Sequence, residues 1–279
     1  MRFRSDAQLD TSQVSDRRSA GPLVAGGGGL VGVLFLVFQL LTGGGGGSSA
    51  IPPLGQLNSD LSKTCVTGED ANQQEDCRIV AVVNSVQAFW EDKLPDYKRA
   101  STVFYKGSTQ TGCGLGTSDV GPFYCPTDEK VYIDLGFYDE LRSQFGAKGG
   151  PLAEAYVIAH EYGHHVENLT GVLGRGQSNA TGPQSAGVRL ELQADCLAGM
   201  WAKGAVDTGF IEDLTEADIQ DGLDAAASIG DDRIQEKVQG QVNPESFTHG
   251  TSEQRQRWFL TGYRSTEIGG CDTFAPPAV

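Results

Sequence analysis

Three of the four histidines in this chain of 279 residues lie between His160 and His165, around one glutamate. His160, Glu161 and His164 form an HExxH motif within "VIAHEYGHHVENLTG". Residues four apart project from one face of a helix, so two imidazole nitrogens can reach one metal ion. Glu161 lies about 100° around the helix from His160, which places its carboxylate beside the ion as a base for an activated water. The alternative interpretation is a pair of surface histidines on a polar helix.

A third ligand is expected from a downstream helix, because a hydrolytic zinc site takes three protein ligands and keeps a fourth position for water. Glu191 in "ELQADC" is the candidate. Asp195 lies one turn further along the same face, where it can accept a hydrogen bond from the nitrogen of a ligand histidine that does not bind metal. A solvated acidic helix face is the alternative.

The fourth histidine, His249, precedes a predicted helix in "THGTSEQRQRWF", six residues before Arg255. An imidazole or a guanidinium near the metal could hold the oxyanion of a tetrahedral intermediate. We predict that His249 is catalytic and that Arg255 supports the metal ligands from behind. A helix-capping or core role for His249 is the alternative.

Together, the HExxH, the downstream ExxxD and the late His-x5-Arg resemble the gluzincin peptidases, and the last element is similar to the membrane-associated M48 group. The stretches "HEYGHHVENLTG", "ELQADCLAGMWA" and "HGTSEQRQRWF" closely resemble the neutral zinc metallopeptidase family of bacteria, over about residues 60 to 272. This resemblance implies one zinc ion per chain, bound by His160, His164 and Glu191. It also implies that Glu161 is the base and that Asp195 supports a ligand.

Two positions depart from this pattern. The M48 group usually has proline after its late histidine, where this chain has Gly250, so the role of His249 carries over least directly. His165 matches no ligand position, and we interpret it as a residue behind the ligands or on the surface.

The elements that must position these residues are read from periodicity and turn signals. Helices are expected from about Asp76 to Trp90, from Pro151 towards Gly171, over about Val188 to Lys203, after a Thr215–Asp218 capping box, and over about Thr251 to Gly262. Between Ser101 and Leu135, the runs "TVFYK", "GPFYC" and "KVYIDL" indicate a small antiparallel or mixed sheet. The predicted fold is therefore α+β, a zincin-like domain with a small sheet and an HExxH helix.

An apolar stretch near the N-terminus predicts a membrane anchor. Residues 22–41 contain Gln39 as their only polar side chain, and about 20 apolar residues suffice to cross a bilayer. Arginines ahead of this stretch favour a cytoplasmic N-terminus. The predicted organisation is a cytoplasmic segment (1–20), a transmembrane helix (21–42), a Gly/Ser/Pro tether (43–59) and an extracytoplasmic zinc metallopeptidase domain (60–279). A cleaved signal peptide is the alternative.

An even number of cysteines outside the cytosol indicates disulfide bonds. The six cysteines allow 15 pairings, and the sequential one is favoured because its first two pairs close short loops. The predicted bonds are Cys65–Cys77, Cys113–Cys125 and Cys196–Cys271. A structural zinc site is the alternative, although no spacing is of the CxxC type.

These features predict a zinc endopeptidase anchored in the cytoplasmic membrane as a single-pass protein. A zinc-activated water, with Glu161 as general base, would hydrolyse a protein or peptide substrate, which an edge of the sheet could hold as an added strand. The net charge of -15 and scattered basic residues exclude nucleic acid as a partner. The alternatives are an extracytoplasmic zinc-stabilised binding or scaffold protein without hydrolytic activity, and zinc hydrolysis of a non-peptide bond. The oligomeric state stays open.

Overall fold

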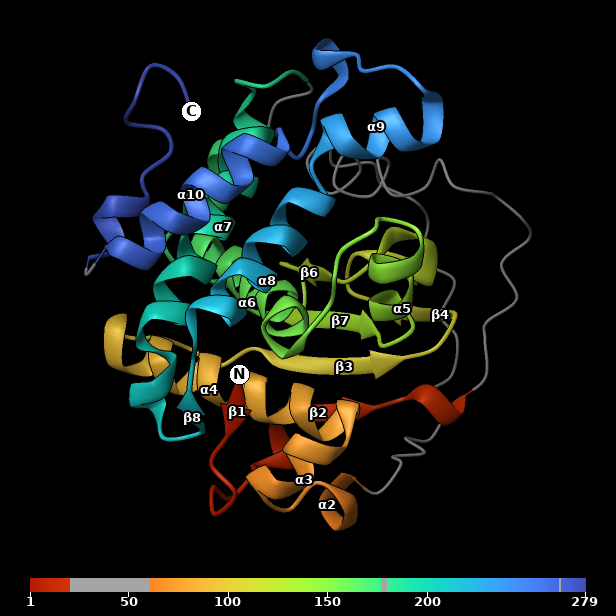
Figure 1. Cartoon of the computed structure of the whole chain (residues 1–279), viewed down its shortest axis with the longest axis vertical. Coiled ribbons are helices and arrows are strands. Elements are labelled where there is room, and N and C mark those ends of the chain that lie inside the picture. The colour runs from red at the N-terminus through yellow and green to blue at the C-terminus, as the bar shows by residue number, and fades with distance from the viewer. Residues whose placement is uncertain (21–60, 177–179, 266) are drawn as a thin grey trace.

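Helices surround a small mixed sheet in the computed structural model, which describes residues 1–20, 61–176, 180–265 and 267–279 (Figure 1). The α-helices in these ranges are α2 (Leu61–Thr64), α3 (Gly68–Gln73), α4 (Glu75–Lys93), α5 (Phe137–Ser143), α6 (Pro151–Leu169), α7 (Ala186–Gly204), α8 (Glu216–Ser228), α9 (Asp231–Gln239) and α10 (Ser252–Arg264). The predicted α+β class is confirmed, and α4, α6, α7, α8 and α10 correspond to the predicted helices. The capping box of Thr215 and Asp218 begins α8 as expected.

Within the described residues, the main sheet has four strands in the order β2-β3-β7-β6. These strands are β2 (Val14–Asp16), β3 (Ser101–Tyr105), β7 (Lys130–Asp134) and β6 (Phe123–Cys125). The pairs β2–β3 and β3–β7 are parallel, whereas β6 pairs antiparallel with β7 and lies at one edge. Two further antiparallel pairs lie apart from this sheet: β1 (Arg2–Phe3) with β8 (Ile211–Asp213), and β4 (Ser108–Thr111) with β5 (Gly114–Thr117).

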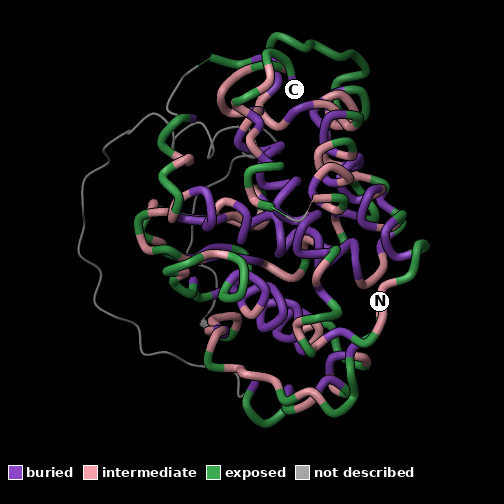
Figure 2. Tube along the Cα trace, turned by 90° about the vertical axis from the view of Figure 1, so that its left-hand side faces the viewer, coloured by how far each residue is buried: buried purple, intermediate pink, exposed green. Residues whose placement is uncertain are grey.

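Buried residues lie in the middle of the chain trace (Figure 2). The helices α4, α6 and α7 contact one another and carry much of the hydrophobic core. Trp90 on α4 and Trp201 on α7 are among its largest fully buried side chains. Pro151 occupies the first turn of α6, where its missing N–H costs no helical hydrogen bond. Gly171 follows the helix with φ +75°, a conformation that favours glycine, so α6 ends where the sequence predicted.

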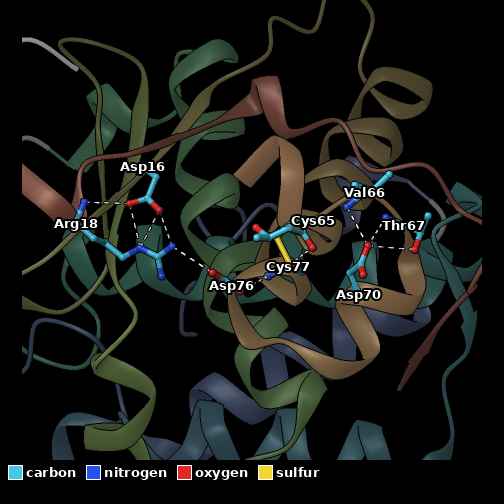
Figure 3. Close-up of a disulfide and its surroundings, with 9 residues drawn as sticks. Asp16, Arg18, Cys65, Val66, Thr67, Asp70, Asp76 and Cys77 are labelled. Carbon is cyan, nitrogen blue, oxygen red and sulfur yellow. Dashed lines mark hydrogen bonds and ion pairs between the residues drawn. A yellow bond between two sulfur atoms is a disulfide. The ribbon is translucent and has the colours of Figure 1, made fainter. Parts of the chain in front are cut away.

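The N-terminal residues belong to the same folded unit as the rest of the described chain. Val14, in β2, pairs in parallel register with Thr102, in β3. Beside the Cys65–Cys77 disulfide, the Arg18 guanidinium binds Asp16 and reaches Asp76 at 3.2 Å (Figure 3). A single membrane crossing between residues 20 and 61 would place these partners on opposite sides of the bilayer.

The predicted localisation is therefore wrong. Within the described parts of the chain, no helix is both long and apolar enough to span a membrane. The pairing of β2 with β3 also contradicts an N-terminus inside and a catalytic domain outside. The predicted transmembrane helix (21–42) and tether (43–59) lie outside the described residues.

The three predicted disulfides are present. Cys196–Cys271 spans 75 residues and joins α7 to the C-terminal segment, whereas the other two bonds each span 12 residues. Both sulfurs of the long-range bond belong to fully buried residues. This bond therefore ties the helix that carries Glu191 to a distant part of the chain.

We expect the double substitution Cys196→Ser/Cys271→Ser to lower the free energy of unfolding by about 4 kcal/mol, because a long loop gains much unfolded-state entropy when it is opened. The matched pair Cys113→Ser/Cys125→Ser opens a short loop and should cost about 3 kcal/mol. Urea unfolding of both variants measures the difference. A larger loss in the Cys113/Cys125 variant would contradict the prediction.

Candidate metal centre

A close approach of α6 and α7 brings the candidate metal ligands together. A side-chain carbon at Gly163 would lie 2.9 Å from the Cα of Ala194, so only glycine permits this helix spacing. Gly163 lies between the two histidines of the motif, and Glu191 lies one turn before Ala194. The two helices thereby bring the HExxH motif on α6 next to Glu191 on α7.

His160, His164 and Glu191 form one cluster at this contact. The Nε2 atom of His160 lies 3.3 Å from Glu191 Oε2, and the Nε2 atom of His164 lies 3.6 Å from Glu191 Oε1. Zinc binds such atoms at about 2.0–2.2 Å in tetrahedral geometry, which separates neighbouring ligand atoms by about 3.3–3.6 Å. The donor set and its spacing therefore fit a zinc ion.

Carboxylates behind the histidines orient both rings. His160 Nδ1 hydrogen-bonds Asp195 at 2.9 Å, and His164 Nδ1 hydrogen-bonds Glu167 at 2.8 Å. Each bond fixes the Nδ1–H tautomer and leaves Nε2 free to bind metal. Asp195 was expected in this position from the sequence. Glu167 was missed, although its spacing of three residues from His164 on a helix is a usable signal.

The charges of the centre favour a cation. Burial alone would lower the pKa of His160, but the carboxylates of Asp195 and Glu191 raise it to about 10. Burial likewise opposes ionisation of Glu191, yet His164, His160 and His249 outweigh it and lower the pKa of Glu191. The carboxylates that hold a proton on His160 would equally stabilise a divalent ion on its Nε2.

Arg255 lies behind the histidines and is engaged by Asp195. Its Nε donates to Asp195 Oδ2 at 2.9 Å, and its Nη2 donates to Asp195 Oδ1 and to the Tyr156 hydroxyl, both at 3.0 Å. Tyr156 in turn donates to Asp195 Oδ1 at 2.5 Å. Arg255 thus holds the carboxylate that orients His160. Tyr156 was not singled out from the sequence, although it lies one turn before His160.

His249 lines the same cavity as the cluster and is held by Asp231. The Asp231 carboxylate accepts hydrogen bonds from the backbone N–H groups of Thr248, His249 and Gly250. Its other oxygen lies 3.3 Å from His249 Nδ1. Burial would lower the pKa of His249, but the Asp231 hydrogen bond and the Glu191 charge raise it. Gly250 has φ +87°, which proline cannot adopt, and this explains the departure from the M48 pattern. Asp231, 18 residues from His249, is marked by no local sequence signal.

Glu161 is buried beside the cluster and also lines the cavity. Burial raises the pKa of its carboxyl group, while the charges of His160 and His164 lower it in part. His165 points elsewhere: its Nε2 donates to the Lys98 carbonyl at 2.6 Å and its Nδ1 meets the Tyr124 hydroxyl at 2.9 Å. His165 therefore fastens α6 to the edge strand β6.

The cavity has a volume of about 370 Å³ and follows α6 on both sides of the cluster. From α6 it is lined by Tyr156, Val157, His160, Glu161, His164 and Asn168. Residues 121–124, from β6 and the turn before it, also border the cavity, as do Leu173, Gly174 and Gly187. No sequence pattern indicates this surface, because its parts come from many separate segments.

Comparison with known proteins agrees with this geometry. A sequence model of the family described as "Putative neutral zinc metallopeptidase" matches residues 1–274. The chain belongs to this family. Its zinc and peptidase class support the predicted zinc cofactor and a peptide substrate, at the level of the family.

The chain is similar to proteins of Mycobacterium tuberculosis and Escherichia coli. The uncharacterized protein Rv2575 of Mycobacterium tuberculosis is 53% identical over 223 residues, which cover 77% of this chain and 76% of the relative. The uncharacterized protein YpfJ of Escherichia coli is 39% identical over 300 residues, covering 98% and 99%. No solved structure matches the chain. The family match includes residues 1–20, in agreement with their place in the fold.

We expect Glu167→Gln to weaken zinc binding by about 10- to 100-fold, the usual effect of losing a carboxylate partner of a ligand histidine. Competition with a fluorescent zinc chelator measures this affinity. Glu154→Gln is the matched control, because Glu154 is buried on the same helix but pairs with Arg78 at 2.8 Å, away from the cluster. Equal zinc affinities in the two variants would contradict the role of Glu167.

Proposed function

We propose that this protein is a zinc-dependent endopeptidase of the gluzincin type. The observation that carries the proposal is that Glu161 lines the same cavity as the three candidate ligands without belonging to their cluster. Structural zinc sites are normally closed by four protein ligands and need no base. Among the described residues, this cluster offers three ligands, and all three line a cavity that can admit a reacting group.

When bound, zinc would polarise the substrate carbonyl and acidify the attacking water. Glu161 then accepts the proton of that water and passes it to the leaving amine. Its raised pKa suits a group that must take up a proton and release it again. His249, held by Asp231, donates a hydrogen bond to the oxyanion that develops on the carbonyl. Arg255 and Asp195 keep His160 oriented during these steps.

The cleft favours cleavage within a chain over removal of terminal residues. From Val157 to Asn168 the cavity follows α6 for about 16 Å, at 1.5 Å per residue, with the ligands in between. An extended peptide therefore finds space on both sides of the metal. Among the described residues β6 forms one edge of the sheet, and this edge, beside Tyr124, can pair with that peptide as an added strand.

The test uses the purified full chain and peptides that are blocked at both termini, which an exopeptidase cannot cut. We expect internal cleavage that stops when zinc is removed with a chelator and returns with one equivalent of zinc. Mass spectrometry of the products identifies the broken bonds. A protein that binds zinc but cuts none of an extensive peptide library would instead fit the zinc-stabilised scaffold.

A further inference from the structure

One end of the cleft is walled by apolar side chains from separate elements. Phe137 begins α5, Phe145 follows that helix, and their ring centroids lie 6.4 Å apart. Ile229 and Ile234 enter from the end of α8 and from α9, and Val157 contributes from α6. We call these five residues the apolar subsite.

Two hydrogen bonds hold the walls of the apolar subsite together. Arg233 of α9 donates to the Gly146 carbonyl at 3.0 Å, and Lys237 donates to the Gln144 carbonyl at 2.9 Å. These bonds fix α9 against the segment that carries Phe145. Ile234 lies between Arg233 and Lys237 in the sequence, so both bonds hold the part of α9 that carries it. They also engage both basic side chains. The subsite is therefore a preformed part of the fold.

The position of Val157 relates the apolar subsite to the scissile bond. Val157 precedes Glu161 by four residues on α6, which corresponds to about 6 Å along the helix. An extended peptide advances about 3.3 Å per residue. A side chain in the subsite therefore belongs to a substrate residue within about two positions of the bond that is cut.

We propose that the apolar subsite binds a bulky hydrophobic side chain, so that the preferred substrates are extended polypeptide segments with leucine, isoleucine, methionine or phenylalanine within about two positions of the scissile bond. This inference rests on the proposed function for the cleavage step but not for binding. Transfer of such a side chain from water into an apolar pocket favours it over alanine by about 10- to 100-fold. Glu140 also lines this end, and a lysine that reaches its carboxylate is the competing occupant.

Binding is measured with the full-length Glu161→Gln protein loaded with zinc, so that affinity is separated from turnover. The probes are end-blocked, fluorescently labelled peptides of one polar sequence that differ at a single residue: Phe, Leu, Ala, Lys or Asp. Fluorescence anisotropy should show Phe and Leu peptides binding about 10- to 100-fold more tightly than the Ala peptide. Tightest binding of the Lys peptide, or equal binding of all five, would overturn the inference.

Substitutions on α9 locate the effect. Ile234→Glu, added to the same protein, should reduce the advantage of Phe over Ala to less than about threefold and improve binding of Lys. Ile234→Ala should reduce the advantage of the Phe peptide over the Ala peptide in part. This variant replaces Ile234→Glu in the test if the glutamate variant folds poorly. Val238→Glu is the matched control, because Val238 is 61% exposed one turn further along α9 and does not line the cavity. Equal effects of Ile234→Glu and Val238→Glu would also overturn the inference. Cleavage of the same peptides by the wild type tests the proposed function separately.

Discussion

The substitution Glu161→Gln should lower the rate of peptide cleavage by about 10²- to 10⁴-fold while zinc content and fold remain unchanged. A positioned general base contributes a factor of this size. Glutamine keeps the size of the side chain and can still accept a hydrogen bond from water, but it cannot take up a proton at neutral pH. Glu161 lies outside the ligand cluster, so its replacement should leave the zinc atoms per chain as in the wild type.

The measurement combines three readouts on the same preparations: zinc per chain by mass spectrometry, thermal unfolding, and initial rates on a blocked peptide. Glu154→Gln on α6 is the matched control, since it makes the same chemical change on the same helix without touching the cavity. We expect the control to retain the wild-type rate within a few-fold. Wild-type turnover in Glu161→Gln would mean that another group is the base, and the proposed mechanism would fail.

The candidate ligand cluster could be predicted from the sequence because helical spacing is local. Two histidines four residues apart lie on the same helix face, independently of the tertiary structure. Glu191 and Asp195 are also four residues apart and share a face for the same reason. Glu167 could have been found in this way. Asp231 could not, because its hold on His249 depends on how α9 begins beside the loop before α10.

The course of the N-terminal segment could not be predicted for the opposite reason. Strand β2 has three residues, and it pairs with β3 across more than 80 positions of sequence. Such short strands carry no periodicity of their own and form only against a partner. The charges of Arg17 and Arg18 suggested a membrane topology signal, whereas Arg18 forms ion pairs with Asp16 and Asp76 inside the fold. Composition alone does not separate these two uses of arginine.

The second large effect is expected from Glu191→Ala, which should remove most of the bound zinc and with it the activity. Loss of one of three ligands should weaken binding by more than the roughly 10- to 100-fold that follows loss of an outer partner such as Glu167. Zinc also stabilises the native protein by RT ln(1 + [Zn]/Kd), about 4 kcal/mol at a thousandfold excess over Kd. The wild type should therefore unfold at a higher urea concentration when zinc is added, and Glu191→Ala should not.

The same experiment separates Glu191 from the two other groups that could serve as third ligand. Asp195 is bound by Arg255 and Tyr156, so Asp195→Ala should unfold more easily even without zinc, by about 3–5 kcal/mol, because it leaves the Arg255 charge buried and unpaired. His249 is held by Asp231, so His249→Ala should keep its zinc and lose turnover.

Gln193→Ala on α7 controls for truncation of a buried polar side chain that lies outside the cavity. If Glu191→Ala kept its full zinc content and His249→Ala lost zinc, the metal would be bound on the other side of the cleft. The third ligand would then be His249 and not Glu191.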